Sequence, residues 1–199
     1  MWDERYQQTD FVYGEAPNDF LAEKAGLLRK GRCLCLAEGQ GRNAVWLAEQ
    51  GFSVTAVDQS SVGMVKAREL AARRGVTIQT EVADLADFDL GADRWDSIVS
   101  IFGHLPSALR RDVHRRVVDA LAPGGTFLLE AYTPDQLATS GTGGPADSDM
   151  LLTLEKLAEE LGDLDILFSQ ETVREVNEGS FHHGEGAVVQ FVARKKQGE

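Results

Sequence analysis

Two patterns of apolar residues alternate along the chain. Short apolar runs rich in branched residues predict buried strands over 32–36, 52–58, 76–82, 95–102 and 126–131. Apolar residues at helical spacing predict the helices between and around them, over 18–30, 44–50, 61–74, 107–121 and 151–161. Two last runs, 165–175 and 187–193, join through an Asn-Glu-Gly turn and predict a hairpin. This order predicts an α/β fold.

Repeated strand–helix steps predict a doubly wound sheet of seven mostly parallel strands, with a C-terminal antiparallel hairpin. Neither repeats nor a linker interrupt the chain, so we expect one domain over 1–199. Within it, 1–30 forms an arm and helix over the cleft, 32–131 the βα core, and 132–199 a loop, a helix and the hairpin. The Gly- and Ser-rich stretch 140–145 predicts a mobile loop.

A glycine turn follows the first strand and precedes a helix. Gly39 and Gly41, with Ala44, satisfy the spacing of a dinucleotide fingerprint. Glu38 stands directly before them, however, where the pyrophosphate of a dinucleotide would meet the helix N-terminus. A carboxylate there favours a ligand with positive charge, such as an amine with a sulfonium.

Acidic and aromatic residues follow the other predicted strands. Asp58 ends the second strand, Asp84 follows the third, 102–104 the fourth and 131–132 the fifth. Ligands of doubly wound sheets bind outside the carboxyl ends of the strands. We therefore expect these residues to converge with Glu38 on one cleft.

The composition of the chain limits the kinds of partner that we expect it to bind. The formal charge of -12 and the scattered basic residues argue against nucleic acid and favour a small molecule. No apolar run approaches the roughly 18 to 20 residues that cross a bilayer, and the N-terminus lacks the pattern of a signal peptide. Cys33 and Cys35, the two cysteines, predict core positions in a reducing compartment. We expect a cytoplasmic protein without a membrane partner, monomeric or weakly homodimeric.

Four motifs together carry a family resemblance that covers nearly the whole chain. They are Leu36–Asn43, Val57-Asp58, Ala83-Asp84-Leu85 and Leu121–Gly125. With them the chain resembles the class I S-adenosylmethionine-dependent methyltransferases. The N-terminal Trp2-Asp3-x-Arg5-Tyr6, 13–18 and the Arg-Asn of 42–43 resemble the branch of tellurite-resistance and thiol methyltransferases. Asn43 departs from the third glycine of many relatives, and asparagine tolerates unusual backbone angles.

The resemblance implies a cofactor, S-adenosylmethionine, and roles for the residues that match. Glu38 and the Gly39–Gly41 backbone would hold its methionine portion, and Asp58 both ribose hydroxyls. Gln59 would flank the adenine, and Asp84 with Leu85 would contact its amino edge. Ile101 and Phe102 would line the floor. The implied cofactor-binding residues are Glu38, Gly39, Gly41, Asn43, Asp58, Gln59, Asp84, Leu85, Ile101 and Phe102. Asp84 alternatively caps the turn that follows it.

The predicted chemistry is displacement at a sulfonium methyl group, which needs alignment and a water-poor site. A thiol, selenol or metalloid lone pair needs little help from a base, whereas oxygen or protonated nitrogen needs a proton acceptor. His104, His182 and His183 are the candidate catalytic bases, and no essential base is the alternative. The alternative for the last two is an exposed turn. We expect His114 on the solvent side of its helix, and no metal site.

Two other functions fit parts of the sequence. An NAD-linked oxidoreductase is compatible with the glycine spacing and Asp58, but Glu38 and the missing Tyr-x-x-x-Lys pair weigh against it. A non-catalytic protein that retains the cofactor site is the second alternative. The sequence leaves the methyl acceptor open.

Overall fold

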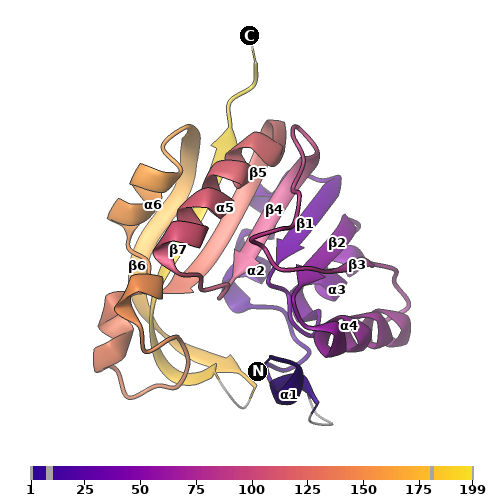
Figure 1. The fold of residues 1–199 in the computed structure, drawn as a ribbon, viewed down its shortest axis with the longest axis horizontal. Helices are drawn as coiled ribbons and strands as arrows, with labels where there is room; N and C mark the ends of the chain where they lie inside the picture. The colour runs from indigo at the N-terminus through magenta and orange to yellow at the C-terminus, as the bar shows by residue number, and fades with distance from the viewer. Residues whose placement is uncertain (1, 8–10, 180–181, 199) are drawn as a thin grey trace.

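One sheet of seven strands forms the centre of the computed structural model, which describes residues 2–7, 11–179 and 182–198 (Figure 1). Its strand order is β3-β2-β1-β4-β5-β7-β6, and β7 runs antiparallel to both of its neighbours. The strands are β1 Arg32–Leu36, β2 Ser53–Asp58, β3 Gln79–Val82, β4 Trp95–Ile101, β5 Leu121–Tyr132, β6 Leu164–Glu178 and β7 His182–Lys195. The predicted doubly wound sheet with its C-terminal hairpin is confirmed.

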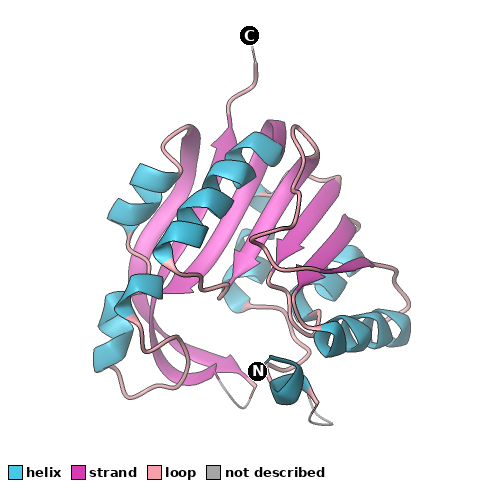
Figure 2. Ribbon diagram, viewed as in Figure 1, coloured by secondary structure: helices cyan, strands magenta, loops and turns pink. Residues whose placement is uncertain are grey.

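Helices cover both faces of this sheet (Figure 2). They are α1 Trp2–Tyr6, α2 Asp19–Lys24, α3 Arg42–Glu49, α4 Ser61–Arg73, α5 Ser107–Ala120 and α6 Leu154–Glu160. Side chains of α5 and α6 pack on the face that carries Leu34 and Leu36. Those of α2, α3 and α4 pack on the opposite face, with Cys33 and Cys35. The two cysteines are free, buried and on one face, as predicted.

Several element boundaries differ from the sequence prediction. Strand β3 is shorter, because 76–78 precede it without pairing, and α6 begins at Leu154 rather than at 151. The predicted turn 122–125 forms a bulge inside β5, since Trp95 pairs with Leu121 but Ser97 pairs with Thr126. The segment 133–149 contains a 3₁₀ turn, Pro134–Ala138. No helix among the described residues is long and apolar enough to cross a membrane.

The C-terminal hairpin is longer than predicted, and this moves two histidines. Strands β6 and β7 pair from Leu164 with Lys195 to Glu178 with His182. His182 and His183 therefore lie in β7 rather than in an exposed turn. The prediction that His114 faces solvent is also wrong. This residue is 5% exposed, and its Nδ1 lies 2.6 Å from Oε2 of Glu160. The polar face of α5 is covered there by α6.

Candidate cofactor and acceptor site

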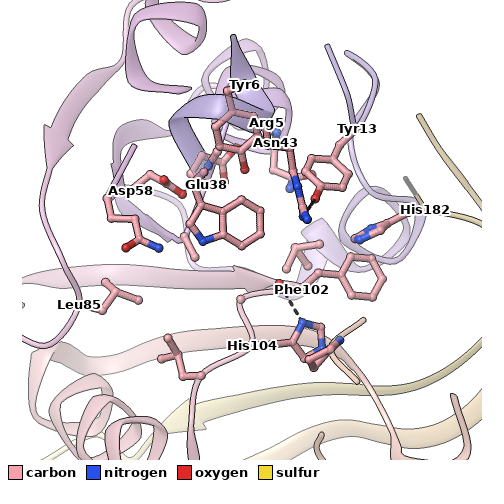
Figure 3. A pocket seen from close by; sticks show the side chains of 18 of the residues that line it. Arg5, Tyr6, Tyr13, Glu38, Asn43, Asp58, Leu85, Phe102, His104 and His182 are labelled. Carbon is pink, nitrogen blue, oxygen red and sulfur yellow. Dashed lines mark hydrogen bonds between the residues drawn. The ribbon is translucent and has the colours of Figure 1, made fainter. Parts of the chain in front are cut away.

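A cavity of about 330 Å³ opens at the carboxyl ends of the parallel strands (Figure 3). All the predicted site residues line it except Gly41 and His183. Its lining residues are Trp2, Arg5, Tyr6, Tyr13, Ala37, Glu38, Gly39, Arg42, Asn43, Asp58, Gln59, Ala83, Asp84, Leu85, Ile101, Phe102, Gly103, His104, Leu105, Gly144, Pro145, Met150 and His182. The predicted convergence is therefore observed for the segments that follow β1 to β4, whereas residues 131–132, at the end of β5, do not line the cavity.

Glu38 caps the helix that follows the glycine turn. The backbone N–H groups of Asn43 and Ala44, in the first turn of α3, donate to its Oε1 at 3.0 and 2.7 Å. A carboxylate is favourable there, because the helix N-terminus carries partial positive charge. Burial raises the pKa of Glu38 to about 7, although these two amides and Arg42 act in the opposite direction. A cationic ligand group beside Glu38 would offset this cost.

Asp58 fastens the same turn to the end of β2. Its Oδ2 accepts from the N–H of Gly39 at 2.9 Å, and its Oδ1 accepts from the N–H of Ser60 at 2.8 Å. The residue is 8% exposed, and this burial raises the pKa of its carboxyl, whereas the two amides lower it. Carboxylate oxygens have further lone pairs, which suit a pair of ligand hydroxyls.

The two glycines of the turn have different neighbours. A Cβ on Gly39, at φ 62°, would lie 2.6 Å from the Tyr6 hydroxyl, so this glycine lets α1 approach the turn. A Cβ on Gly41, at φ 87°, would lie 2.5 Å from Cβ of Ala67 in α4. Gly41 thus serves the packing of α3 on α4 rather than lining the cavity.

Two non-glycine residues at the site have left-handed backbones. Ala37 follows β1 with φ 49°, and Phe102 follows β4 with φ 53°. This conformation is costly for a bulky residue and is found mainly where function requires it. At Phe102 it places the ring on the cavity wall, stacked on Tyr132 with centroids 4.6 Å apart.

Asp84 lies at the cavity and also caps the turn that follows it, the alternative role that the sequence offered. It lines the cavity with Gln59 and Leu85, and its Oδ1 also accepts from the N–H of Ala86 at 2.9 Å, a turn-capping bond. The N–H of Ala83 donates to the Asp58 carbonyl at 3.0 Å, which holds this turn beside the second strand.

His104 is fastened by backbone groups at both ring nitrogens. Its Nδ1 lies 3.1 Å from the Phe102 carbonyl, and the N–H of Tyr132 donates to its Nε2 at 3.0 Å. Because Nε2 accepts this bond, Nδ1 must be the protonated nitrogen, so the ring is neutral and joins the ends of β4 and β5. Burial lowers its pKa to about 4. This geometry disagrees with a role for His104 as the catalytic base.

His182 lies among aromatic rings on the same wall of the cavity as Phe102. Its ring centroid lies 4.6 Å from Tyr13, 4.9 Å from Phe102 and 5.6 Å from Tyr132. Its Nδ1 and the Tyr132 hydroxyl are buried without a hydrogen-bond partner among the described residues. Burial lowers the pKa of His182 to about 3, so the ring is neutral at pH 7. His183, the next residue, is exposed and does not line the cavity, which does not support a catalytic role there.

The N-terminal helix α1 contributes side chains that sequence reasoning did not assign to the cofactor. Trp2, Arg5 and Tyr6 line the cavity. Tyr6 is 4% exposed and stacks on Trp2 with centroids 5.9 Å apart. The sequence predicted only an arm over the cleft here, because nothing local in it shows that Tyr6 packs on Gly39.

A cluster of buried charges joins the cofactor side to the hairpin. This buried charge cluster consists of Arg42, Glu130, Glu178 and the half-buried Arg174, with the amides of Asn18 and Gln190 beside them. Arg42 of α3 pairs with Glu178 of β6, and Asn18 donates to Glu130 and Glu178 at 2.6 and 2.7 Å. Arg174 also pairs with both carboxylates. Glu178 pairs with His182 in the β-ladder, so the cluster connects α3, which carries Arg42, with the strand that carries His182.

The fold and the site together define a nucleoside-binding α/β protein whose ligand carries a cationic group. Residues 33–125 match a family model described as a methyltransferase domain. The 2-heptyl-1-hydroxyquinolin-4(1H)-one methyltransferase of Mycobacteroides abscessus is 30% identical over 105 residues, which are 49% of this chain and 46% of that protein. The thiopurine S-methyltransferase of Legionella pneumophila is 24% identical over 188 residues, 85% of this chain and 82% of that protein.

The fold of TehB from Haemophilus influenzae is also similar, with a TM-score of 0.73 and 21% identity over 98% of this chain and 66% of TehB. The first curated relative thus matches over less than half its length, and the second over most of it. Residues 33–125, just under half of the chain, are thus similar to a methyltransferase domain, in agreement with the family resemblance of the sequence.

Proposed function

We propose that the protein transfers a methyl group from S-adenosylmethionine to a small-molecule thiol, selenol or metalloid. The observation that carries this proposal is Glu38, whose carboxylate occupies the helix N-terminus inside the cavity while Asp58 faces the same space. The two acids suit a ligand that combines a cationic end with a ribose.

The residues present fit this cofactor better than they fit NAD. A pyrophosphate needs the amides of the first turn of α3, but Glu38 already accepts from Asn43 and Ala44 and would repel the phosphates. A volume of about 330 Å³ lies in the range of small-molecule sites. Glu38 would hold the ammonium group of the cofactor, and Asp58 the ribose hydroxyls.

The chain would contribute binding, orientation and exclusion of water to this reaction. When bound, the cofactor supplies an activated methyl group. Apolar and aromatic surface lines the acceptor side of the cavity, at Phe102, Tyr13 and His182. This surface keeps water from the nucleophile. His104 has no ring nitrogen to spare, and His182 is a weak base. These features support an acceptor that needs no protein base, such as a thiol or selenol.

Similar proteins support the thiol class. The Legionella relative is named for S-methylation of thiopurines, whereas TehB is similar in fold alone. The N-terminal motif, similar to that of tellurite-resistance methyltransferases, adds a metalloid oxyanion to the candidates. The Mycobacteroides relative acts on a hydroxyquinolone, so an acidic hydroxyl also belongs in a substrate screen.

Parallel calorimetric titration with S-adenosylmethionine, S-adenosylhomocysteine and NAD tests the proposal. We expect micromolar binding of the two adenosyl sulfur compounds and none of NAD. Binding of NAD alone would instead favour the oxidoreductase. Methylation assays with thiols, selenite and tellurite follow, because binding without turnover of any acceptor would favour a non-catalytic protein.

A further inference from the structure

The parallel ladder between β4 and β5 ends with a side chain in place of a backbone bond. At this end the N–H of Phe102 donates to the Glu130 carbonyl at 2.8 Å. The next bond of a parallel ladder would join the N–H of Tyr132 to the carbonyl of Phe102. The His104 ring bridges these two groups instead: its Nε2 accepts from Tyr132 at 3.0 Å, and its Nδ1 lies 3.1 Å from the Phe102 carbonyl oxygen (Figure 3). The imidazole is thus inserted into the ladder.

This insertion accompanies the left-handed turn at Phe102. A bulky residue keeps a φ of 53° only where its surroundings hold it there. His104 is such a hold, because its Nδ1–H donates to the carbonyl of this same residue while its Nε2 is fixed to the end of β5. The turn places the Phe102 ring on the cavity wall. The position of that ring therefore depends on the two bonds of the imidazole.

The same turn also touches the cofactor side of the cavity. Gly103 follows Phe102, and a Cβ on Gly103 would lie 3.2 Å from Cβ of Ala37. Ala37, itself left-handed with φ 49°, directly precedes Glu38. A shift of the turn at the end of β4 would therefore change how the acceptor side is placed relative to Glu38. Displacement at a methyl group needs the donor and acceptor in line, and a misplacement of about 1 Å can cost roughly 10²-fold in rate.

We propose that His104 is a positioning residue for methyl transfer, which aligns the acceptor side of the cavity with the cofactor side by holding the turn at Phe102. This inference rests on the proposed function. His104 neither moves a proton nor contacts the reacting atoms in this role, since both of its nitrogens stay bonded to the backbone. Its donor and its acceptor, rather than its ring, are then what the reaction requires.

Packing of the ring has to be separated from its hydrogen bonds. The His104 ring lies 14° from the plane of Tyr132 and 19° from that of Phe102, so it contributes contacts as well as bonds. His104→Phe keeps an aromatic ring but has neither a donor nor an acceptor. His104→Gln loses the ring, whereas its amide still offers one donor and one acceptor. If the ring only filled space, the phenylalanine variant would be the more active of the two.

The turnover of a thiol accepted by the unmodified protein tests the proposal. We count cofactor sites by the calorimetric stoichiometry of S-adenosylhomocysteine, so that kcat refers to folded protein alone. The kcat of His104→Phe should fall about 10- to 100-fold, and His104→Gln should recover most of this loss. The Kd for S-adenosylhomocysteine should change less than about twofold in both variants. His183→Gln, exposed and outside the cavity lining, is the matched control and should change neither quantity.

The reverse order of the two variants, or equal kcat values in both, would overturn the positioning role while the proposed function stands. An unmodified protein that binds S-adenosylhomocysteine but methylates no acceptor would overturn the proposed function and this role together. NMR of the histidine ring nitrogens at neutral pH adds a test without an acceptor. The signals that His104→Gln removes should belong to a neutral ring protonated at Nδ1. A ring protonated at Nε2 could not accept from Tyr132, and would overturn the proposal whatever the activities.

Discussion

The two walls of the cavity are built in different ways. On the cofactor wall, carboxylates bind backbone amides of the turns beside them: Glu38 binds Asn43 and Ala44, and Asp58 binds Ser60 and Gly39. On the acceptor wall, rings from distant segments line the cavity at Tyr13, Phe102 and His182, and the buried ring of Tyr132 stacks on Phe102. The first wall is set by short-range hydrogen bonds, and the second depends on how the N-terminal arm and the hairpin meet.

This difference suggests which wall binds a constant ligand and which wall can vary with the acceptor. Backbone amides present the same groups whatever the side chains, so a wall built on them suits a constant ligand such as a cofactor. Ring packing depends on the size of each side chain, so a wall built on it suits a specific acceptor. Variants that act on one wall, or on the cluster between them, test this division.

The largest effect is expected where the two walls are joined. Glu178→Ala should lower the free energy of unfolding by about 3 to 5 kcal/mol, because Arg42 is left buried without its carboxylate. Chemical denaturation monitored by circular dichroism measures this change. Glu175→Ala, on the exposed face of the same strand, is the control and should change stability by less than about 0.5 kcal/mol.

A small effect of Glu178→Ala would mean that the walls are coupled mainly by apolar packing. The double variant with Arg42→Met separates these possibilities. If the pair dominates, removing both charges should cost less than removing Glu178 alone, because no uncompensated charge remains at this pair.

Asp58→Ala should affect the cofactor wall alone. Loss of charge-assisted hydrogen bonds to the ribose should weaken binding of S-adenosylhomocysteine by roughly 1.5 to 3 kcal/mol, measured by calorimetry. Asp87→Ala, outside the cavity lining, is the control. Unchanged affinity in the Asp58 variant would place the ribose elsewhere.

The contrast between the walls also explains how far the sequence predicts this molecule. The succession of strands and helices and the residues around Glu38 and Asp58 follow from local signals, namely apolar period, glycine turns and acids at strand ends. The structure of the acceptor wall does not follow from local signals in the sequence. The burial of His182 follows from the length of β7 and its pairing with β6. Likewise, the capture of both His104 nitrogens by backbone groups of two strands has no local signature.

Ligand affinity at the cofactor wall should also depend on pH. In the proposed site the ionised form of Glu38 would bind the ammonium group, and burial raises the pKa of Glu38 to about 7. Below that pH a proton must leave before the cofactor binds, so affinity should rise with pH. Between pH 6 and 8 the Kd for S-adenosylhomocysteine should fall about tenfold. Calorimetry in buffers of matched ionic strength measures it.

Glu38→Gln is the control for this pH dependence. It retains a side-chain oxygen that can accept from the amides of α3 but cannot ionise. Its affinity should be weaker than that of the unmodified protein at pH 8 and nearly constant across the range. A variant that keeps the full pH dependence would assign the titration to a group other than Glu38.

The smallest effects are expected at the histidines of the acceptor wall. If the nucleophile needs no base, His182→Gln should lower kcat for an accepted thiol by less than about tenfold, well short of the full 10²–10⁴-fold contribution of a general base. The rise of kcat with pH should follow the thiol rather than the protein. His183→Ala, one residue away and exposed, should change neither kcat nor stability. A loss of a hundredfold or more in His182→Gln, together with the loss of a pH limb, would restore His182 as a catalytic base. The acceptor wall would then contribute chemistry as well as shape.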